Sequence, residues 1–176
     1  MPTNLDLVQC YFQKELPGFC IERNSIIRTK VLARVWELSQ DRPLSVLDAG
    51  CGSCAMWPPF LQQVQHVTFH GMDLNDKAVS EAKVQLPQFR ENIHVGRGEE
   101  LSKLFPQKFD VIVSQSVFEH VYRRTQFMES ICAALKDDGV LLLTYGSQHF
   151  REGFGTTVRN RASELLAFAG LDRYYA

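Results

Sequence analysis

The sequence predicts an α/β fold with a doubly wound, mainly parallel sheet and N-terminal helices. Three observations support this prediction. Short β-rich runs alternate with helix-like segments after residue 43, several of these runs are almost entirely apolar, and a glycine-rich loop follows the first of them. Strands that are apolar on both faces are typical of parallel sheets covered by helices on both sides.

The first 42 residues are predicted to be helical. Four apolar residues recur at helical spacing before residue 17: Leu5, Val8, Tyr11 and Phe12. We expect the proline–glycine pair at 17–18 to end that segment. A second helix is predicted over residues 25–39, which carry an apolar stripe. With 176 residues the chain fits a single domain, with a helical segment at 1–42 and an α/β core at 43–176.

The core supplies five predicted strands and the helices between them. The strands are expected at residues 45–49, 67–73, 93–96, 110–114 and 140–145. The helices are expected at residues 60–65, 77–85, 127–135 and 162–169. Open sheets of this kind bind ligands at the carboxyl ends of their strands, so the residues that follow each strand are the candidates for function.

Composition excludes several classes of protein. Hydrophobic residues make up 45% and charged residues 22%, which is typical of a globular domain and excludes a disordered chain. The formal net charge of −1 lacks the basic excess of nucleic-acid-binding proteins. No apolar run approaches the ~20 residues of a membrane span. Five cysteines form an odd set and the start lacks the features of a secretory signal, so a cytoplasmic location is expected.

The loop after the first predicted strand has two possible ligands. Gly50, Gly52 and Ala55 fit the dinucleotide pattern, with Asp73 about 20 residues further on. Asp48, at the end of the strand, is better suited to a cationic amino group, which S-adenosylmethionine carries and NAD lacks at this point. An acid at a strand end is also commonly a cap or turn former, and that reading stays open for Asp48 and Asp73.

Four blocks in order resemble the class I S-adenosylmethionine-dependent methyltransferases, of the small-molecule type with Glu-His-Val after the fourth strand. They are Val-Leu-Asp-Ala-Gly-Cys-Gly at 46–52, Gly-Met-Asp-Leu at 71–74, Phe-Asp-Val-Ile-Val-Ser-Gln-Ser-Val-Phe-Glu-His-Val at 109–121, and Leu-Lys-Asp-Asp-Gly-Val-Leu-Leu-Leu-Thr at 135–144. The resemblance covers roughly residues 45–171 and implies a Rossmann-like fold with S-adenosyl-L-methionine as cofactor.

The resemblance also implies roles for individual residues. The methionine end would be held by Asp48, Gly50 and Gly52, with Cys51 lining the same loop. The ribose and adenine would be held by Asp73, Leu74, Gly98 and Glu99. The sulfonium would lie over Ser114 and Gln115.

Three departures from the family pattern stand out. Cys54 replaces a glycine often found in the first loop, and the following helix is expected to start near Pro58. Arg97 stands where many relatives carry an acid that binds the adenine amino group. The C-terminal edge strands look shortened or missing, so a homodimer through the open sheet edge is one hypothesis and a shortened form of a longer protein is another.

Catalytic candidates are few. His120 and His149 follow the fourth and fifth predicted strands, where either imidazole could serve as a general base or simply pack. Cys51 and Cys54 have the spacing of a metal or redox pair but lack a second pair, so no metal site is expected.

The sequence therefore predicts an S-adenosylmethionine-dependent methyltransferase that acts on an O, N or C nucleophile of a small-molecule acceptor. The alternative is a catalytically inactive, methyltransferase-like binding or regulatory protein. A dehydrogenase ranks third, because only the glycine pattern favours it.

Overall fold

The computed structural model describes residues 17–106 and 108–145 and contains one parallel sheet of five strands in the order β3-β2-β1-β4-β5. All four strand pairs are parallel. The strands are β1 (Leu44–Ala49), β2 (Val67–Asp73), β3 (Ile93–Val95), β4 (Phe109–Gln115) and β5 (Leu135–Thr144). The predicted fold class is confirmed within these residues, because the strand order reverses beside β1 as in doubly wound sheets.

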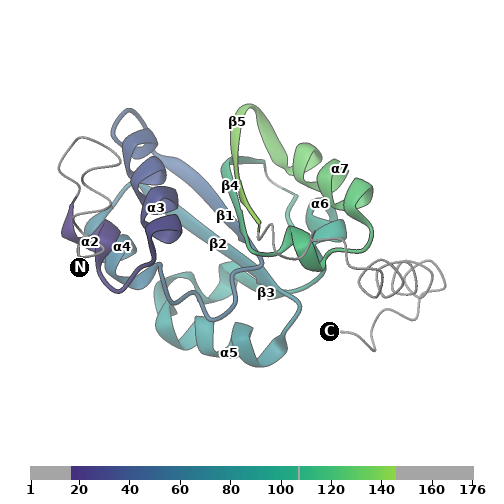
Figure 1. Cartoon of the computed structure of the whole chain (residues 1–176), viewed down its shortest axis with the longest axis horizontal. Coiled ribbons are helices and arrows are strands. Elements are labelled where there is room, and N and C mark those ends of the chain that lie inside the picture. Colours follow the sequence, from purple (N-terminus) through teal and green to yellow (C-terminus); the bar gives the residue numbers. More distant parts are fainter. Residues whose placement is uncertain (1–16, 107, 146–176) are drawn as a thin grey trace, which may run out of the picture.

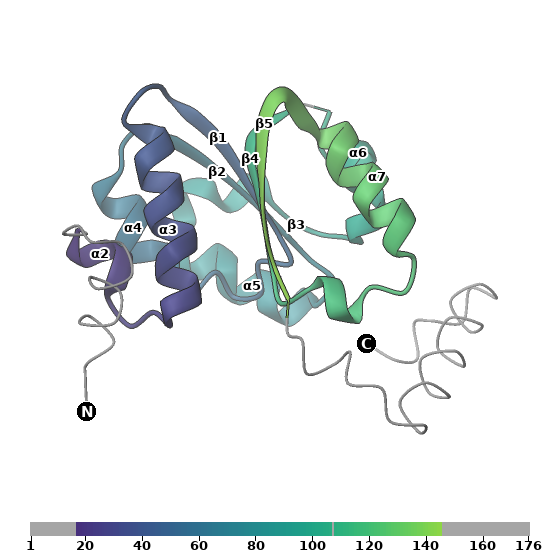
Figure 2. The same cartoon turned by 45° about the horizontal axis from the view of Figure 1, so that its top comes forward.

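Helices cover both faces of the sheet (Figures 1 and 2). The α-helices are α2 (Gly18–Ile21), α3 (Ile26–Ser39), α4 (Pro58–Gln63), α5 (Asp76–Gln85), α6 (Leu101–Leu104) and α7 (Arg124–Ala134). Three short 3₁₀ helices join them: η1 (Pro87–Asn92), η2 (Gly98–Glu100) and η3 (Phe118–His120). One apolar core packs α3, α4 and α5 against one face, and a second packs α6 and α7 against the other.

Local chemistry explains where the helices flanking the glycine loop begin. The Ser25 hydroxyl accepts a hydrogen bond from the Arg28 N–H and so caps α3. Pro58 occupies the first turn of α4, as the sequence predicts, because its missing N–H costs nothing there. The Asn75 side chain accepts from the Lys77 and Ala78 N–H groups at the start of α5. These caps fix α3, α4 and α5 around the carboxyl ends of β1 and β2.

Pro17 precedes the first turn of α2, which begins at Gly18; the helical segment that this proline–glycine pair is predicted to end lies before the described residues. One predicted strand boundary is wrong. The fifth strand begins at Leu135, five residues before the predicted start at 140. Its first half is irregular, since Leu135 pairs with Phe109 whereas Val140 pairs with Val111. Three other predictions concern residues outside the described ranges. They are the helix at 162–169, the N-terminal helix before residue 17 and the shortened C-terminal edge.

A buried carboxylate ties β4 to both neighbouring strands at the end of the sheet remote from the glycine loop. The Asp110 side chain is only 2% exposed and accepts from the Ser45 N–H at 2.8 Å and from Lys136 Nζ at 3.0 Å, and it also pairs with Arg42. Burial opposes ionisation, but the Ser45 N–H and the two cations outweigh it and lower the pKa of Asp110.

Asp110→Asn is expected to lower the free energy of unfolding at pH 7 by about 2 kcal/mol, because it removes charge-assisted hydrogen bonds. Since the folded-state pKa is depressed, the carboxylate stabilises the protein above pH ~4 and loses this effect as pH falls further. Urea unfolding should therefore separate the variant from the natural protein at pH 7, and the difference should shrink as the pH falls below ~4. Asp138→Asn, at a carboxylate that is 73% exposed, should change little.

Candidate cofactor site

Two neighbouring cavities open at the carboxyl ends of the strands, where the strand order reverses between β1 and β4. The larger, about 590 Å³, lies over the ends of β1, β2 and β3, and the smaller, about 290 Å³, lies between α3 and the glycine loop. Gly50, Gln115 and Ser116 line both cavities. The geometry therefore suits an elongated ligand that crosses from one cavity to the other at these three residues.

The glycine loop between β1 and α4 is tightly wound. Gly50 and Gly52 have φ values of 98° and 53°, in the region that favours glycine. The Gly50 and Cys51 N–H groups both donate to the Met72 carbonyl, at 2.7 and 3.0 Å. A Cβ on Gly52 would meet nothing within 4 Å, so the backbone here faces open space in the smaller cavity. A ligand can approach the chain closely at this point.

Asp48 is a buried carboxylate with one oxygen uncompensated by the described residues. Its side chain is 3% exposed; Oδ2 accepts from Trp57 Nε1 at 2.6 Å, and Oδ1 has no hydrogen-bond partner there. Burial raises the pKa of Asp48 to about 7, against the opposing effect of the Trp57 hydrogen bond. Asp48 lines the smaller cavity, and Arg28 of α3 lines the same space. A cavity bordered by a carboxylate and a guanidinium suits a zwitterion.

Asp73, at the end of β2, serves the loop as well as the larger cavity. Its Oδ2 accepts from the Gly52 N–H at 2.8 Å and its Oδ1 from the Asn75 N–H at 2.9 Å. A carboxylate oxygen can accept more than one hydrogen bond, so neither contact prevents Asp73 from binding ligand hydroxyls. The sequence left open that Asp73 only forms a turn. That contact uses only part of the hydrogen-bonding capacity of the Asp73 carboxylate.

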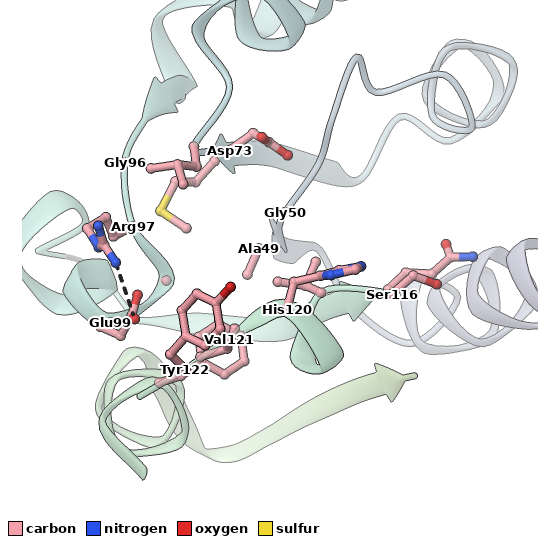
Figure 3. Close-up of a pocket in the computed structure, with 16 residues that line it drawn as sticks. Ala49, Gly50, Asp73, Gly96, Arg97, Glu99, Ser116, His120, Val121 and Tyr122 are labelled. Carbon is pink, nitrogen blue, oxygen red and sulfur yellow. Dashed lines mark ion pairs between the residues drawn. The ribbon is translucent and has the colours of Figure 1, made fainter. Parts of the chain in front are cut away.

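The far end of the larger cavity combines apolar and charged groups (Figure 3). Leu74 lines it and is 50% exposed, and Gly98 lies against the Phe127 ring, since a Cβ there would come within 2.3 Å of it. Glu99 Oε1 lies 3.9 Å from Arg97 Nη2, and both residues line the cavity. A flat apolar ring with polar edges suits such surroundings.

The loop after β4 forms the remaining wall. Ser116 has a φ of 55°, uncommon for a residue with a side chain, and its N–H donates to the Thr144 carbonyl at 2.9 Å. His120 closes η3 and lines the larger cavity together with Tyr122. In Figure 3 the Arg97–Glu99 pair and His120 stand at opposite sides of the cavity, and the ring of Tyr122 lies between them.

Most of the residues singled out from the sequence lie in these cavities. The larger is lined by Gly50, Asp73, Leu74, Gly98, Glu99, Gln115 and His120, and the smaller by Asp48, Gly50, Cys51, Gly52 and Gln115. Ser114 is completely buried and lines neither cavity. His149 lies outside the described residues.

Sequence reasoning missed Arg28, Ser116 and Tyr122. Ser116 directly follows the candidate Gln115, and Tyr122 lies two residues after the candidate His120. Proximity in the sequence could therefore have indicated both. Arg28 had no such signal, because it is one of several exposed cations on a helix that precedes the motifs.

The paired cysteines of the glycine loop are poorly suited to metal binding or redox chemistry. A hydrogen bond with Cys54, and then burial, raise the pKa of the Cys51 thiol far above its ordinary range. A thiol that stays protonated is a weak nucleophile and a weak metal ligand. In the part of the chain that the structure describes, no cluster of three or more His, Cys, Asp or Glu side chains could hold a metal ion.

The sheet order and the cavities at its switch point define a Rossmann-like α/β domain. A family model described as "Methyltransferase domain" matches residues 47–141, just over half of the chain. The chain belongs to this family, the class I S-adenosylmethionine-dependent methyltransferases, as the four sequence blocks predict.

Relatives of known sequence or structure agree with this family. A malonyl-[acyl-carrier protein] O-methyltransferase of Halalkalibacterium halodurans is 27% identical over 120 residues, which are 65% of this chain and 44% of that protein. The chain thus spans less than half the length of this curated relative.

Two solved structures share the fold. A TehB-like S-adenosylmethionine-dependent methyltransferase of Corynebacterium glutamicum has a TM-score of 0.56 at 21% identity, covering 86% of this chain and 74% of that one. The plantazolicin methyltransferase BamL, solved with a desmethyl substrate analogue and S-adenosylhomocysteine, has a TM-score of 0.59 at 20% identity, covering 87% and 60%.

The described helices include none with the length and apolar character needed to cross a membrane.

Proposed function

We propose that this protein transfers a methyl group from S-adenosylmethionine to an O, N or C nucleophile of a small-molecule acceptor. The observation that carries the proposal is that a carboxylate, Asp48, and a guanidinium, Arg28, line the same smaller cavity. An α-amino acid end needs an acceptor for its ammonium and a donor for its carboxylate, and the vacant Asp48 Oδ1 and the Arg28 guanidinium supply them.

The larger cavity supports the rest of the cofactor. Asp73 is available to accept from ribose hydroxyls, and Leu74 offers apolar surface to the adenine ring. Glu99 offers an acceptor at the cavity edge near Arg97, where the family pattern has an acid. Gly50, Gln115 and Ser116 line both cavities, which is compatible with a sulfonium near these residues. These residues fit S-adenosylmethionine better than NAD, which has no amino acid end.

The chain's contribution to the reaction is alignment. The bound cofactor supplies a methyl group on a sulfonium leaving group. Gln115 and Ser116 border the transfer point, and His120 is within the same cavity, where an imidazole could accept a proton from an acceptor hydroxyl. A base is needed only when the acceptor's nucleophile carries a proton, so His120 has a role for some acceptors and not for others.

Relatives support a small-molecule acceptor. One relative is named for malonyl-[acyl-carrier protein], and one structural neighbour was solved with a plantazolicin analogue. We extend the proposal to a cytoplasmic location on the odd number of cysteines, which form no evident disulfide framework.

Calorimetric titration with S-adenosylmethionine, S-adenosylhomocysteine and NAD tests the cofactor assignment. Binding of the first two at micromolar concentrations without NAD supports it, and transfer of labelled methyl groups to an acceptor library then tests the reaction. Binding of NAD alone, or of none of the three, would contradict the proposal. Cofactor binding without transfer to any acceptor would favour the catalytically inactive alternative.

Arg28→Gln is expected to weaken S-adenosylhomocysteine binding about tenfold, because one charge-assisted contact to the carboxylate is lost. Binding of 5′-methylthioadenosine, which lacks the amino acid end, should not change. Calorimetry with both ligands makes the comparison. Arg34→Gln, an exposed arginine on the same helix paired with Glu37, is the matched control. Equal weakening for both ligands would count against the assigned contact.

A further inference from the structure

Trp57 is a buried tryptophan whose one polar atom is directed at Asp48. The indole Nε1 donates to Asp48 Oδ2 at 2.6 Å, and the side chain has no exposed surface. Its ring packs against Phe60 with centroids 5.8 Å apart and against Phe69 with centroids 4.9 Å apart. Aromatic contacts on two sides restrict the orientation of the indole, so the position of Nε1 is set by the packing of the core.

The glycine loop delivers Trp57 to this place through two successive turns. The Cys54 N–H donates to the Cys51 carbonyl at 2.9 Å, and the Trp57 N–H donates to the Cys54 carbonyl at 3.0 Å. Cys54 has a φ of 60°, so the chain reverses there at a residue with a side chain. The Trp57 carbonyl then accepts from the Leu61 N–H at 2.8 Å. The glycine loop that lines the smaller cavity thus also carries Trp57, the residue that binds Asp48.

Resting on the proposed function, we infer that Trp57 is a positioning residue for the cofactor's amino acid end. It holds Asp48 Oδ2 and thereby turns the other oxygen, Oδ1, toward the ammonium of S-adenosylmethionine. A carboxylate attached by a single bond rotates freely unless one oxygen is anchored. Among the described residues, the indole is the only hydrogen-bond partner of the Asp48 side chain.

The indole also acts on the charge of Asp48. Burial raises the pKa of Asp48, and the Trp57 hydrogen bond opposes this rise because an N–H donor stabilises the ionised form. The other groups that act on this carboxyl are Asp73, which raises its pKa, and Arg28, which lowers it. Without the indole donor, less of the carboxylate would be ionised at neutral pH, and a cationic ligand would bind only at higher pH.

Trp57→Phe tests the inference, because phenylalanine keeps an aromatic ring in the core and removes the donor. S-adenosylhomocysteine binding should weaken about tenfold at pH 7, and its dependence on pH should move to higher pH. Binding of 5′-methylthioadenosine should stay within twofold of the natural protein. Phe89→Leu, which disturbs the same aromatic cluster at Phe69 and not at Trp57, should affect neither the selectivity between these ligands nor the pH profile.

Unchanged S-adenosylhomocysteine binding in Trp57→Phe, or equal weakening for both ligands, would overturn the inference. Failure of the natural protein to bind either ligand would contradict the proposed function instead.

A second measurement does not depend on the folding of that variant. The chain has two tryptophans, so Trp36→Phe leaves Trp57 as the sole emitter. Its fluorescence should change as Asp48 titrates and on addition of S-adenosylhomocysteine, but not of 5′-methylthioadenosine. Fluorescence insensitive to both pH and S-adenosylhomocysteine would likewise overturn the inference.

Discussion

Asp48→Asn is expected to abolish cofactor binding while making the unliganded protein more stable at pH 8. Asparagine can still accept from Trp57 Nε1, so the local hydrogen bond survives while the negative charge is lost. Loss of a buried charge pair typically costs 2–5 kcal/mol, which corresponds to at least ~30-fold weaker binding of S-adenosylhomocysteine. Calorimetry measures the affinity, and Asp41→Asn, at an exposed site, is the control.

The stability effect of the same change follows from the sign of the pKa shift. Burial raises the pKa of Asp48 from 3.8 to about 7, so the folded protein retains a proton that the unfolded chain releases. Stability from this group is complete below pH ~4 and falls by up to ~1.4 kcal/mol per pH unit until pH ~7. Asp48→Asn escapes this loss, and thermal unfolding should show a higher midpoint at pH 8 but little difference at pH 4. A lower midpoint at pH 8 would contradict this account.

Gly50→Ala is expected to be the most damaging change of a single small residue. An added Cβ would lie 2.1 Å from Val117 Cγ2, and the φ of 98° is strained for any residue with a side chain. Overpacking and backbone strain each contribute ~1–3 kcal/mol, so unfolding by urea should show a loss of several kcal/mol. Ligand binding should weaken as well, because Gly50 lines both cavities.

Two further variants separate the causes of this loss. Val117→Ala in the Gly50→Ala background removes the clashing methyl group and should restore part of the stability, with the backbone strain remaining. Gly18→Ala, where an added Cβ meets nothing within 4 Å, should leave stability close to that of the natural protein. No recovery in the double variant would mean that the clash with Val117 is not a significant part of the effect.

The strands near the glycine loop were predictable because they are short, apolar and bounded by turn residues. β1 and β2 match the prediction to within one residue, and the start of α4 follows from the chemistry of Pro58. The beginning of β5 was not predictable, since Lys136 to Gly139 are polar and read as a turn. They lie in the strand because β5 pairs with β4 both before and after a shift in register. This pairing is a long-range feature that local sequence does not encode.

The candidate site was predictable to the extent that strand ends carry it. Asp48 and Asp73 were identified because each lies at the end of a predicted strand, and each lines one of the two cavities. Arg28 and Trp57 were not, because their proximity to Asp48 results from the packing of α3 and of the loop before α4 against the sheet. In the sequence, Trp57 is an apolar residue of a predicted loop. Only the 2.6 Å hydrogen bond from its Nε1 to Asp48 distinguishes it from other buried aromatic residues.

The hydrogen bonds that join the glycine loop to β2 have a kinetic consequence. The N–H groups of Gly50, Cys51 and Gly52 donate to the Met72 carbonyl or to Asp73, so the loop is held by hydrogen bonds within the chain. A segment ordered in advance loses little conformational entropy on association, and no slow rearrangement of it precedes the encounter. If the proposed cofactor binds here, we therefore expect its exchange not to be gated by this loop and the residence time of the product to depend on the contacts that it makes.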